Sequence, residues 1–301
     1  MTTKLTGVCT ITLTPFDDCG NIDEASLRKL TNFYIDSGVH GMTILGIMGE
    51  SHKLTENERL RVTDIVMEET KGRVPVVVGC TSRGTNVCAM LAKRAEEAGA
   101  AAVMIAAPAG LKNEDMLFRH YEEIAKQISI PIVIQDEPVT TGVIMSPKFL
   151  AKLNKEIPNC QYVKLEEAPT TVKTSKILEL TGDNLGIFGG LGGMYFYEEL
   201  DRGAIGIMTG FAYPEVLVKT FEKFSNGDKS GARDYFYHYL PLIRFEAQLG
   251  IGGVTIRKEI FKMRDAIKSA HVRFPGAAVD DRTLDEVKEL INYVGLTTVS
   301  S

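Results

Sequence analysis

Eight short apolar runs, separated by longer amphipathic segments, constrain the fold of this chain more than any other feature. Each run is continuous and rich in Val or Ile, which is typical of strands buried on both faces. Eight alternating strand and helix units predict an α/β fold, a closed (βα)8 TIM barrel with parallel strands. An open doubly wound sheet is the alternative, but no GxGxxG follows the first run. The runs are residues 8–14, 42–46, 75–79, 103–107, 131–135, 162–165, 186–190 and 204–210.

Helix signals lie between these runs. Thr55 and Glu58 have the spacing of a capping box, in which each side chain bonds the other's backbone N–H. Ser146 followed by Pro147 reads as an N-cap with proline at the first helical position, and Pro214 suits the same position. A weak internal repeat of a helix end, small residues and a strand supports the layout. Its copies are residues 38–44, 99–105 and 203–209.

The strand-like runs stop near residue 213, and the remaining sequence reads as helices. No Pro/Gly/Ser linker interrupts the chain, so we expect one domain with an appendix. Residues 1–212 form the predicted barrel core, and residues 213–301 supply the last barrel helix and a C-terminal helical extension. The expected helices are 213–225, 229–249, 256–270 and 281–294.

Composition excludes several classes of function. The net charge is −5 and Lys and Arg are scattered, so neither nucleic acid nor a membrane is an expected partner. No apolar stretch approaches the ~20 residues of a membrane span, and no signal peptide is visible. The five cysteines have no metal-binding spacing, so no metal site is expected, and their odd number in a chain of this length predicts reduced thiols and a cytoplasmic location.

A lysine in the sixth run is the first candidate for chemistry. Lys164 interrupts an apolar segment near the carboxyl end of a strand, where the active sites of such barrels lie. Burial favours the uncharged amine. A free amine adds to a ketone or aldehyde to form an iminium, which acts as an electron sink. Alternatively, Lys164 is the cation of an ion pair, because strand alternation puts Glu166 on the same face.

Glycine-rich loops supply further candidates at the same end of the barrel. In "GIMGES" (46–51), Gly46 and Gly49 allow backbone N–H groups to form a nest for a carboxylate, or make a tight turn without a ligand. Glu50 acts in the site or, as we favour, anchors this loop. In "GGLGG" (189–193), Gly189 and Gly190 allow close approach of a substrate, or a flexible loop.

Five stretches together resemble the pyruvate-dependent class I aldolases of the dihydrodipicolinate synthase / N-acetylneuraminate lyase family. The resemblance runs over nearly the whole chain. The stretches are "GVCTITLTPFDDCGNID" (7–23), "GIMGES" (46–51), "PIVIQDEPVTTGV" (131–143), "YVKLEEAP" (162–169) and "GAIGIMTG" (203–210).

This resemblance implies a substrate and a set of contacts. A 2-keto acid, either pyruvate or a 2-keto-3-deoxy acid, would condense with Lys164, and its carboxylate would bind the backbone N–H groups near Met48, Gly49 and Glu50. It implies no metal or organic cofactor, and a homo-oligomer, a tetramer or a dimer. Lys164 and Gln135 would be catalytic. The implied substrate contacts are Gly46, Ile47, Met48, Gly49, Glu50, Asp136, Thr140, Gly189, Gly190 and Ile207.

The chain departs from the family pattern at the proton relay. Gln135 stands where the family usually has a tyrosine, and glutamine cannot titrate. Asp136 replaces an asparagine, Ile47 and Met48 replace hydroxyl residues, and Thr140 replaces the arginine of the lysine-pathway synthase. We therefore predict a divergent branch rather than that synthase. The candidates for the missing acid or base are Asp136, Glu137, His52 and Tyr195.

Three functions remain open from the sequence. The first is a Schiff-base lyase that acts on a 2-keto acid through Lys164, by aldol, retro-aldol or dehydration chemistry. The second is a non-catalytic 2-keto acid sensor that keeps binding and has lost turnover. The third, an open-sheet nucleotide-binding enzyme, is disfavoured because no GxxxxGK[ST] motif is present.

Overall fold

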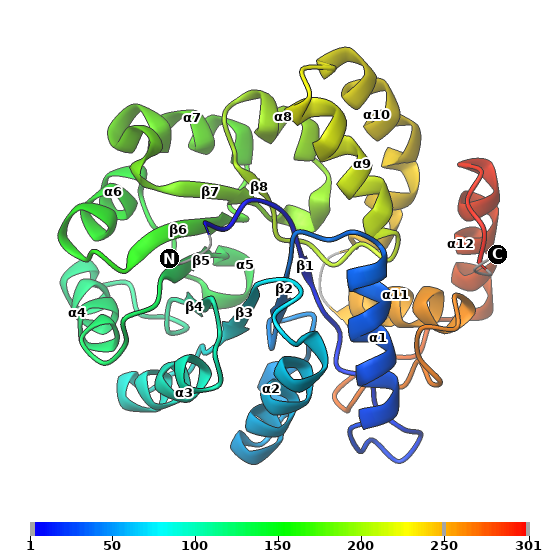
Figure 1. Ribbon diagram of the computed structural model, residues 1–301, viewed down its shortest axis with the longest axis horizontal. Helices are drawn as coiled ribbons and strands as arrows, with labels where there is room; N and C mark the ends of the chain where they lie inside the picture. Colours follow the sequence, from blue (N-terminus) through cyan, green and yellow to red (C-terminus); the bar gives the residue numbers. More distant parts are fainter. Residues whose placement is uncertain (1–3, 249–250, 299–301) are drawn as a thin grey trace.

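The chain folds into a closed barrel of eight parallel strands in sequence order (Figure 1). The computed structural model describes residues 4–248 and 251–298, without the side chains of 251 and 252. The closed ring of eight parallel strands confirms the predicted TIM barrel. The strands are β1 (Gly7–Ile11), β2 (Gly41–Ile44), β3 (Val76–Gly79), β4 (Ala102–Ala106), β5 (Ile132–Asp136), β6 (Cys160–Leu165), β7 (Gly186–Gly189) and β8 (Gly206–Ile207).

Helices surround the strands, and α11 and α12 lie at one side of this ring, near α1 and α10 (Figure 1). The barrel-covering helices are α1 (Glu24–Asp36), α2 (Glu56–Thr70), α3 (Thr85–Glu97), α4 (Glu114–Ala125), α6 (Pro147–Glu156), α7 (Thr170–Thr181), α8 (Phe196–Asp201) and α9 (Pro214–Ser225). The others are the short α5 (Pro138–Thr141) and the C-terminal α10 (Lys229–Glu246), α11 (Ile251–Met263) and α12 (Asp281–Tyr293). Short 3-10 turns are η1 (Ser51–Lys53), η2 (Gly182–Asn184) and η3 (Leu191–Gly193).

The local signals in the sequence fix several helix starts. Thr55 and Glu58 form the predicted capping box, and the Ser146 hydroxyl accepts a hydrogen bond from Phe149 N. Pro214 is the first residue of α9. The expected helix over 256–270 was wrong at both ends, because α11 begins at Ile251 and ends at Met263. Asp265 follows with a left-handed φ of 54°, which an α-helix cannot continue through. Residue 249, the expected end of α10, lies outside the described residues.

Two hydrophobic clusters lie on opposite faces of the barrel wall. The inner cluster fills the barrel and includes Tyr162, Phe188 and Met208, and the larger outer cluster lies between strands and helices. The Tyr162 hydroxyl accepts a hydrogen bond from Leu5 N at 3.2 Å and so ties the chain start to the barrel interior. Successive strand residues face opposite sides of the sheet. Lys164 is two residues beyond Tyr162 and therefore lies on the same inner face.

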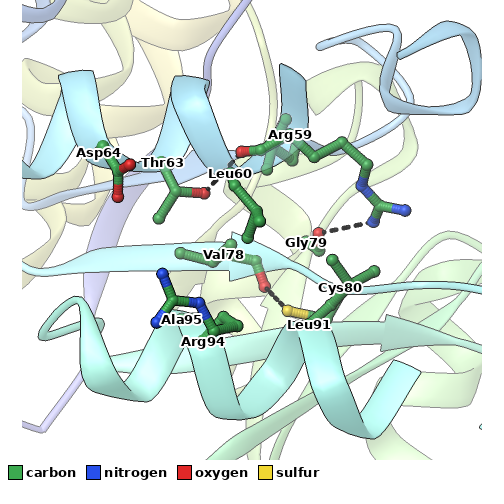
Figure 2. A pocket seen from close by; sticks show the side chains of 11 residues that line it. Arg59, Leu60, Thr63, Asp64, Val78, Gly79, Cys80, Leu91, Arg94 and Ala95 are labelled. Atoms are coloured by element: carbon green, nitrogen blue, oxygen red, sulfur yellow. Dashed lines mark hydrogen bonds between the residues drawn. The ribbon is translucent and has the colours of Figure 1, made fainter. Parts of the chain in front are cut away.

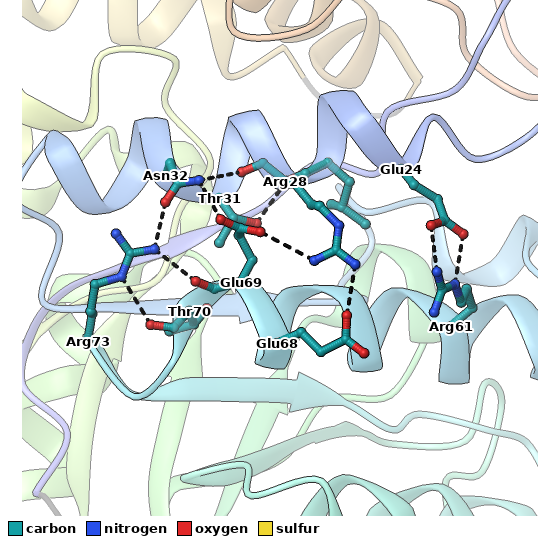
Figure 3. Close-up of polar contacts among 10 residues, drawn as sticks. Glu24, Arg28, Thr31, Asn32, Arg61, Glu68, Glu69, Thr70 and Arg73 are labelled. Carbon is teal, nitrogen blue, oxygen red and sulfur yellow. Dashed lines mark hydrogen bonds and ion pairs between the residues drawn. The ribbon is translucent and has the colours of Figure 1, made fainter.

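Exposed ion pairs join α1 to α2 on the outside of the barrel (Figure 3). Arg61 bonds Glu24 at 2.6 and 2.7 Å, and Arg28 bonds Glu68 at 2.8 Å. Exposed pairs of this kind contribute roughly 0.2–1 kcal/mol each. Burial of the two clusters, rather than these pairs, therefore accounts for most of the stability.

Candidate functional site

Lys164 lies on the inner face of the barrel near the carboxyl end of β6. Only 5% of its surface is exposed. Its neighbours across the sheet are Gln135 on β5 and Phe188 on β7. Phe188 belongs to the inner cluster, so the lysine amine extends from an apolar floor toward the mouth of the barrel.

The amine of Lys164 contacts a carboxylate. Its Nζ lies 2.7 Å from Glu166 Oε1, and Gln135 Nε2 donates to the same oxygen at 2.9 Å. We call these three residues the Lys–Glu–Gln cluster. The ion pair that the sequence left open is therefore present. The Glu166 side chain keeps 15% of its surface exposed, so the cluster borders solvent.

Sequence reasoning missed Glu166 as a functional group and treated it only as a partner for Lys164. The signal was available, because a Lys-x-Glu spacing on an extended segment puts both side chains on one face. The β-ladder continues past β6, since Glu166 N donates to Asp136 O at 3.0 Å. Glu166 is thus held by the sheet itself at the mouth.

Two glycines at the carboxyl end of β7 make room for glutamates rather than for a substrate alone. A Cβ on Gly190 would lie 2.4 Å from Glu166 Cγ, and a Cβ on Gly189 would lie 1.7 Å from Glu199 Oε2. Any side chain at either position would displace these carboxylates. Glu199 is 2% exposed, and burial raises its pKa to about 7.

Asp136 and Ile207, both expected at the mouth, lie on the outer face instead. Asp136 follows Gln135 directly, so its side chain points the other way. Its Oδ2 contacts Lys173 Nζ of α7 at 2.5 Å, and Lys173 also contacts Glu167. Burial raises the pKa of Asp136 to about 6, an effect that Lys173 opposes. Ile207 belongs to the outer cluster, whereas Met208 belongs to the inner one.

Within the described residues, no hydrogen bond or ion pair joins the remaining relay candidates to Lys164. Glu137 caps α5 by accepting from Thr140 N at 2.8 Å, and Thr140 itself is exposed. His52 is exposed on η1, and Tyr195 is 44% exposed before α8. Among the acids that sequence reasoning considered for the proton relay, the structure brings none to the amine.

Some backbone N–H groups of the turn after β2 donate hydrogen bonds to carbonyl oxygens of the same turn. Gly49 N donates to Gly46 O at 3.1 Å, and Glu50 N donates to Ile47 O at 3.0 Å. Of the three N–H groups expected to hold a carboxylate, these two are committed to the turn. The Met48 N–H has no hydrogen-bond partner among residues 4–248 and 251–298.

Glu50 ties this turn to the C-terminal extension. It is 1% exposed and accepts from Lys53 Nζ at 2.8 Å, Lys258 Nζ at 2.6 Å and Arg273 N at 3.1 Å. Lys258 is fully buried, and burial lowers its pKa to about 8 against the opposing effect of Glu50. Glu50 has a left-handed φ of 54°, which is uncommon outside glycine. The contacts of Glu50 are those of an anchor for the loop.

Two cavities lie away from the mouth of the barrel. One of about 10 Å³ lies between α2, β3 and α3, lined by Arg59, Val78 and Leu91, and is large enough for about one water (Figure 2). The other, about 360 Å³, lies at the amino ends of β6 and β7 beside Gln161 and Gly186. Within the described part of the chain, no group of three His, Cys, Asp or Glu side chains has a metal-binding arrangement. The same residues contain no helix that is long and apolar enough to cross a membrane.

The fold is a (βα)8 barrel that carries a buried lysine on the inner face of its sixth strand. The model of the dihydrodipicolinate synthetase family matches residues 4–294, and the chain belongs to this family. It is 32% identical over 274 residues to L-2-keto-3-deoxyarabonate dehydratase of Azospirillum brasilense, covering 89% of this chain and 88% of that protein.

Other relatives carry different names. The chain is 35% identical over 239 residues to the 4-hydroxy-tetrahydrodipicolinate synthase of Syntrophobacter fumaroxidans, covering 78% of this chain and 81% of that one. The crystal structure of dihydrodipicolinate synthase from Rhodopseudomonas palustris superposes with a TM-score of 0.90 at 34% identity, covering 96% and 97% of the two chains. The family thus includes both synthases and a dehydratase.

Proposed function

We propose that this protein is a Schiff-base-forming lyase that removes water from a 2-keto-3-deoxy acid through Lys164. The observation that carries the proposal is the Lys–Glu–Gln cluster, in which Glu166 Oε1 contacts both Lys164 Nζ and Gln135 Nε2. A nucleophile and a titratable acid then share one site on the inner face of the barrel.

The ion pair supplies a route to the reactive amine. An ammonium group has no lone pair and cannot attack a carbonyl. Transfer of its proton across the 2.7 Å contact leaves a neutral amine on Lys164 and a carboxylic acid on Glu166. The proton stays within the cluster, where it can be returned later in the cycle.

The reaction balances with these groups alone. Lys164 Nζ attacks C2 of the keto acid, and the carbonyl oxygen leaves as water after taking one proton from the attacking amine and one from the Glu166 carboxylic acid, which gives the iminium and a Glu166 carboxylate. Glu166 as carboxylate removes a proton from C3, and that electron pair moves into the iminium to form an enamine. The enamine expels the C4 hydroxyl, which takes the proton from Glu166 and leaves as water. Hydrolysis then frees the amine and the product.

Glu166 takes the place of the family tyrosine in this proposal. A carboxyl group can act as base at C3 and as acid at C4 in succession, whereas Gln135 can only donate and accept hydrogen bonds. The role of Gln135 is to orient Glu166 through its amide N–H. Asp136 and Thr140 are not substrate contacts in this scheme, because one faces outward and the other is exposed.

Dehydration is favoured over the synthase reaction by the site rather than by the relatives. Relatives of similar identity include both a dehydratase and synthases. The arginine that the synthase has at position 140 is absent from this chain, and position 135 lacks the tyrosine that is usual in the family as a whole. Retro-aldol cleavage uses the same iminium and differs only in the bond that breaks.

The proposal also covers the substrate class, the cofactor requirement, the location and the oligomeric state of the enzyme. A small soluble keto acid is the substrate, no metal or organic cofactor takes part, and the enzyme works in the cytoplasm as a homo-oligomer. Sedimentation of the purified chain would give the oligomeric state directly.

Two assays on one sample test the function. The first treats the protein with borohydride in the presence of pyruvate and a panel of 2-keto-3-deoxy acids, and measures the mass added to the chain. The second follows the products of unreduced reactions. We expect a stable adduct and loss of water from at least one 2-keto-3-deoxy acid. Pyruvate release would identify retro-aldol cleavage instead, adducts without any turnover would favour a sensor, and no adduct with any acid would reject the lyase.

A further inference from the structure

The C-terminal extension places a buried arginine beside the β2 turn. Arg257 lies on α11 and is 4% exposed. Its Nη1 lies 3.1 Å from the sulfur of Met48, a residue of the turn that the carboxylate nest was expected to use. The sequence positions are far apart, so no local pattern could have joined them.

The guanidinium of Arg257 has more donors than acceptors around it. Its Nε lies 3.2 Å from Glu246 Oε1 without hydrogen-bond geometry, and both this Nε and Glu246 Oε2 lack hydrogen-bond partners. The thioether facing Nη1 is a weak acceptor. The buried Tyr34 hydroxyl also lies close enough to interact with this charge, but it forms no hydrogen bond with the guanidinium. Buried donors normally find acceptors, so this excess indicates that an acceptor is missing.

Glu246 does not complete the site. Burial raises the pKa of Glu246 to about 7, and its Oε1 also accepts from Ala212 N at 2.8 Å. A guanidinium keeps its charge under all ordinary conditions. Glu246 therefore fixes the position of Arg257 but leaves much of its positive charge for another partner.

The free edge of Arg257 lies at the rim of the barrel. A Cβ placed on Gly210, just after β8, would lie 3.7 Å from both Arg257 Nη1 and Met48 Cγ, and 3.1 Å from Ile11 O. Met48 also packs against the inner cluster. The guanidinium thus approaches the space above the barrel interior, on the side formed by β1, β8 and the β2 turn.

This rim is also short of donors for an anion. Ile47 and Met48 carry no hydroxyl groups, and Gly49 and Glu50 spend their N–H groups inside the turn. The N–H of Met48 has no acceptor within the described ranges. An anion at this place would meet the N–H groups of Ile47 and Met48, neither of which has an acceptor within the described ranges, and the nearby guanidinium.

We propose that Arg257 binds the carboxylate of the 2-keto acid together with the Met48 N–H, and so makes the enzyme specific for keto acids over neutral carbonyl compounds. The inference rests on the proposed function for the identity of the ligand. Arginine suits this role because its planar guanidinium can donate two parallel N–H hydrogen bonds to the two oxygens of a carboxylate. The flexible Met48 side chain would move aside, and a carboxylate oxygen would replace its sulfur at Nη1.

The test compares a charged and a neutral carbonyl compound. Borohydride trapping rates are measured with pyruvate and with pyruvamide, which keeps the ketone and lacks the charge. In the unaltered protein we expect pyruvate to react much faster. In Arg257→Gln we expect the pyruvate rate to fall roughly 10- to 100-fold, as loss of a hydrogen bond to a charged group implies. The pyruvamide rate should change little, so the preference should collapse.

Matched variants separate this role from folding. Arg264→Gln removes another arginine near the same helix, which bonds Glu215 and Ala212 O, and should keep the preference. Arg257→Lys keeps the charge without the fork and should give an intermediate preference. Equal loss of both trapping rates in Arg257→Gln, or an unchanged preference in a folded variant, would overturn the inference.

A direct binding measurement distinguishes this inference from the proposed function. Calorimetric titration with pyruvate needs no iminium. If the unaltered protein binds pyruvate without being trapped, and Arg257→Gln binds at least tenfold more weakly, the lyase fails and the carboxylate site stands. If trapping occurs at Lys164 but Arg257→Gln binds pyruvate as well as the unaltered protein does, the carboxylate site fails and the lyase stands.

Discussion

Two buried lysines on opposite faces of the barrel wall invite comparison. Lys164 on β6 points inward and contacts one carboxylate, Glu166, which also accepts from a neutral amide. Lys173 on α7 packs against the outside of the same wall and contacts two carboxylates, Asp136 and Glu167. The exposed fractions of the two lysines are similar, 5% and 7%.

The comparison shows that burial alone does not mark a reactive lysine. Lys173 contacts two carboxylates and lies on helix α7, outside the barrel wall. Lys164 has a single acidic partner that can take its proton, and it lies at the open end of the barrel. Two properties therefore distinguish the lysines: the face of the sheet on which the side chain lies, and the number of carboxylates that it contacts. Each lysine and each carboxylate can be substituted separately.

The largest effect is expected at the inner lysine. Lys164→Met should abolish trapping with every keto acid and reduce turnover by more than about a thousandfold, because no iminium can form. Intact-mass spectrometry after borohydride reduction and a turnover assay measure both. Residual trapping at the original rate in a folded variant would mean that another amine is the nucleophile.

The acid beside this lysine should give the next largest effect. Glu166→Gln keeps the shape of the side chain but cannot carry a proton, so turnover should fall about 10²- to 10⁴-fold. Some adduct should still form, because the amine remains. The matched control is Glu167→Gln, whose carboxylate contacts Lys173 on the outer face. Equal losses of turnover in the two variants would remove the distinction between the faces.

The outer lysine should affect stability rather than chemistry. Lys173→Met leaves Asp136 and Glu167 without a cation and should cost roughly 3–5 kcal/mol of unfolding free energy. The variant that remains folded should still be trapped by a keto acid. Urea denaturation measures the cost, and the exposed Lys176→Met on the same helix is the control. A loss of trapping in folded Lys173→Met would contradict a purely structural role.

Glu199, buried against Gly189, should give the smallest and most specific effect. Its pKa rises from about 4.5 in the unfolded chain to about 7 in the fold, so the folded state binds the proton more tightly. This group's contribution to stability should therefore fall as pH rises from about 4.5 to about 7, and level off above. Its size should be on the order of 1–3 kcal/mol.

Urea titrations across this pH window, for the unaltered protein and Glu199→Gln, isolate that contribution. The difference in unfolding free energy between them should shift in favour of the variant with rising pH. Glu179→Gln, an exposed change on α7, should leave the pH profile unaltered. A constant difference across the window would show that Glu199 has no raised pKa.

The sequence predicted the architecture well because the signal is local and repeated. Continuous apolar runs, Thr55 with Glu58, and Ser146 with Pro147 each act over a few residues, and the structure has all of them. Lys164 was found because a charge inside an apolar run is conspicuous at one position.

The site was predicted less completely, for two physical reasons. The inward or outward direction of a side chain at a strand end depends on the register, so Asp136 and Ile207 were expected as substrate contacts although their side chains lie on the outer face. Contacts between distant segments leave no local pattern. Lys258 and Arg257 contact residues of the β2 turn that lie about two hundred positions earlier in the sequence. The sequence of the helix that carries them does not indicate these contacts.

Peptide mapping of the borohydride-reduced adduct tests the central claim most directly. The protein is reduced in the presence of a 2-keto acid and digested, and tandem mass spectrometry locates the added mass. The account predicts that the modification lies on Lys164 alone, with Lys173 and Lys258 unmodified. A modification on either of those two lysines, with Lys164 intact, would contradict it.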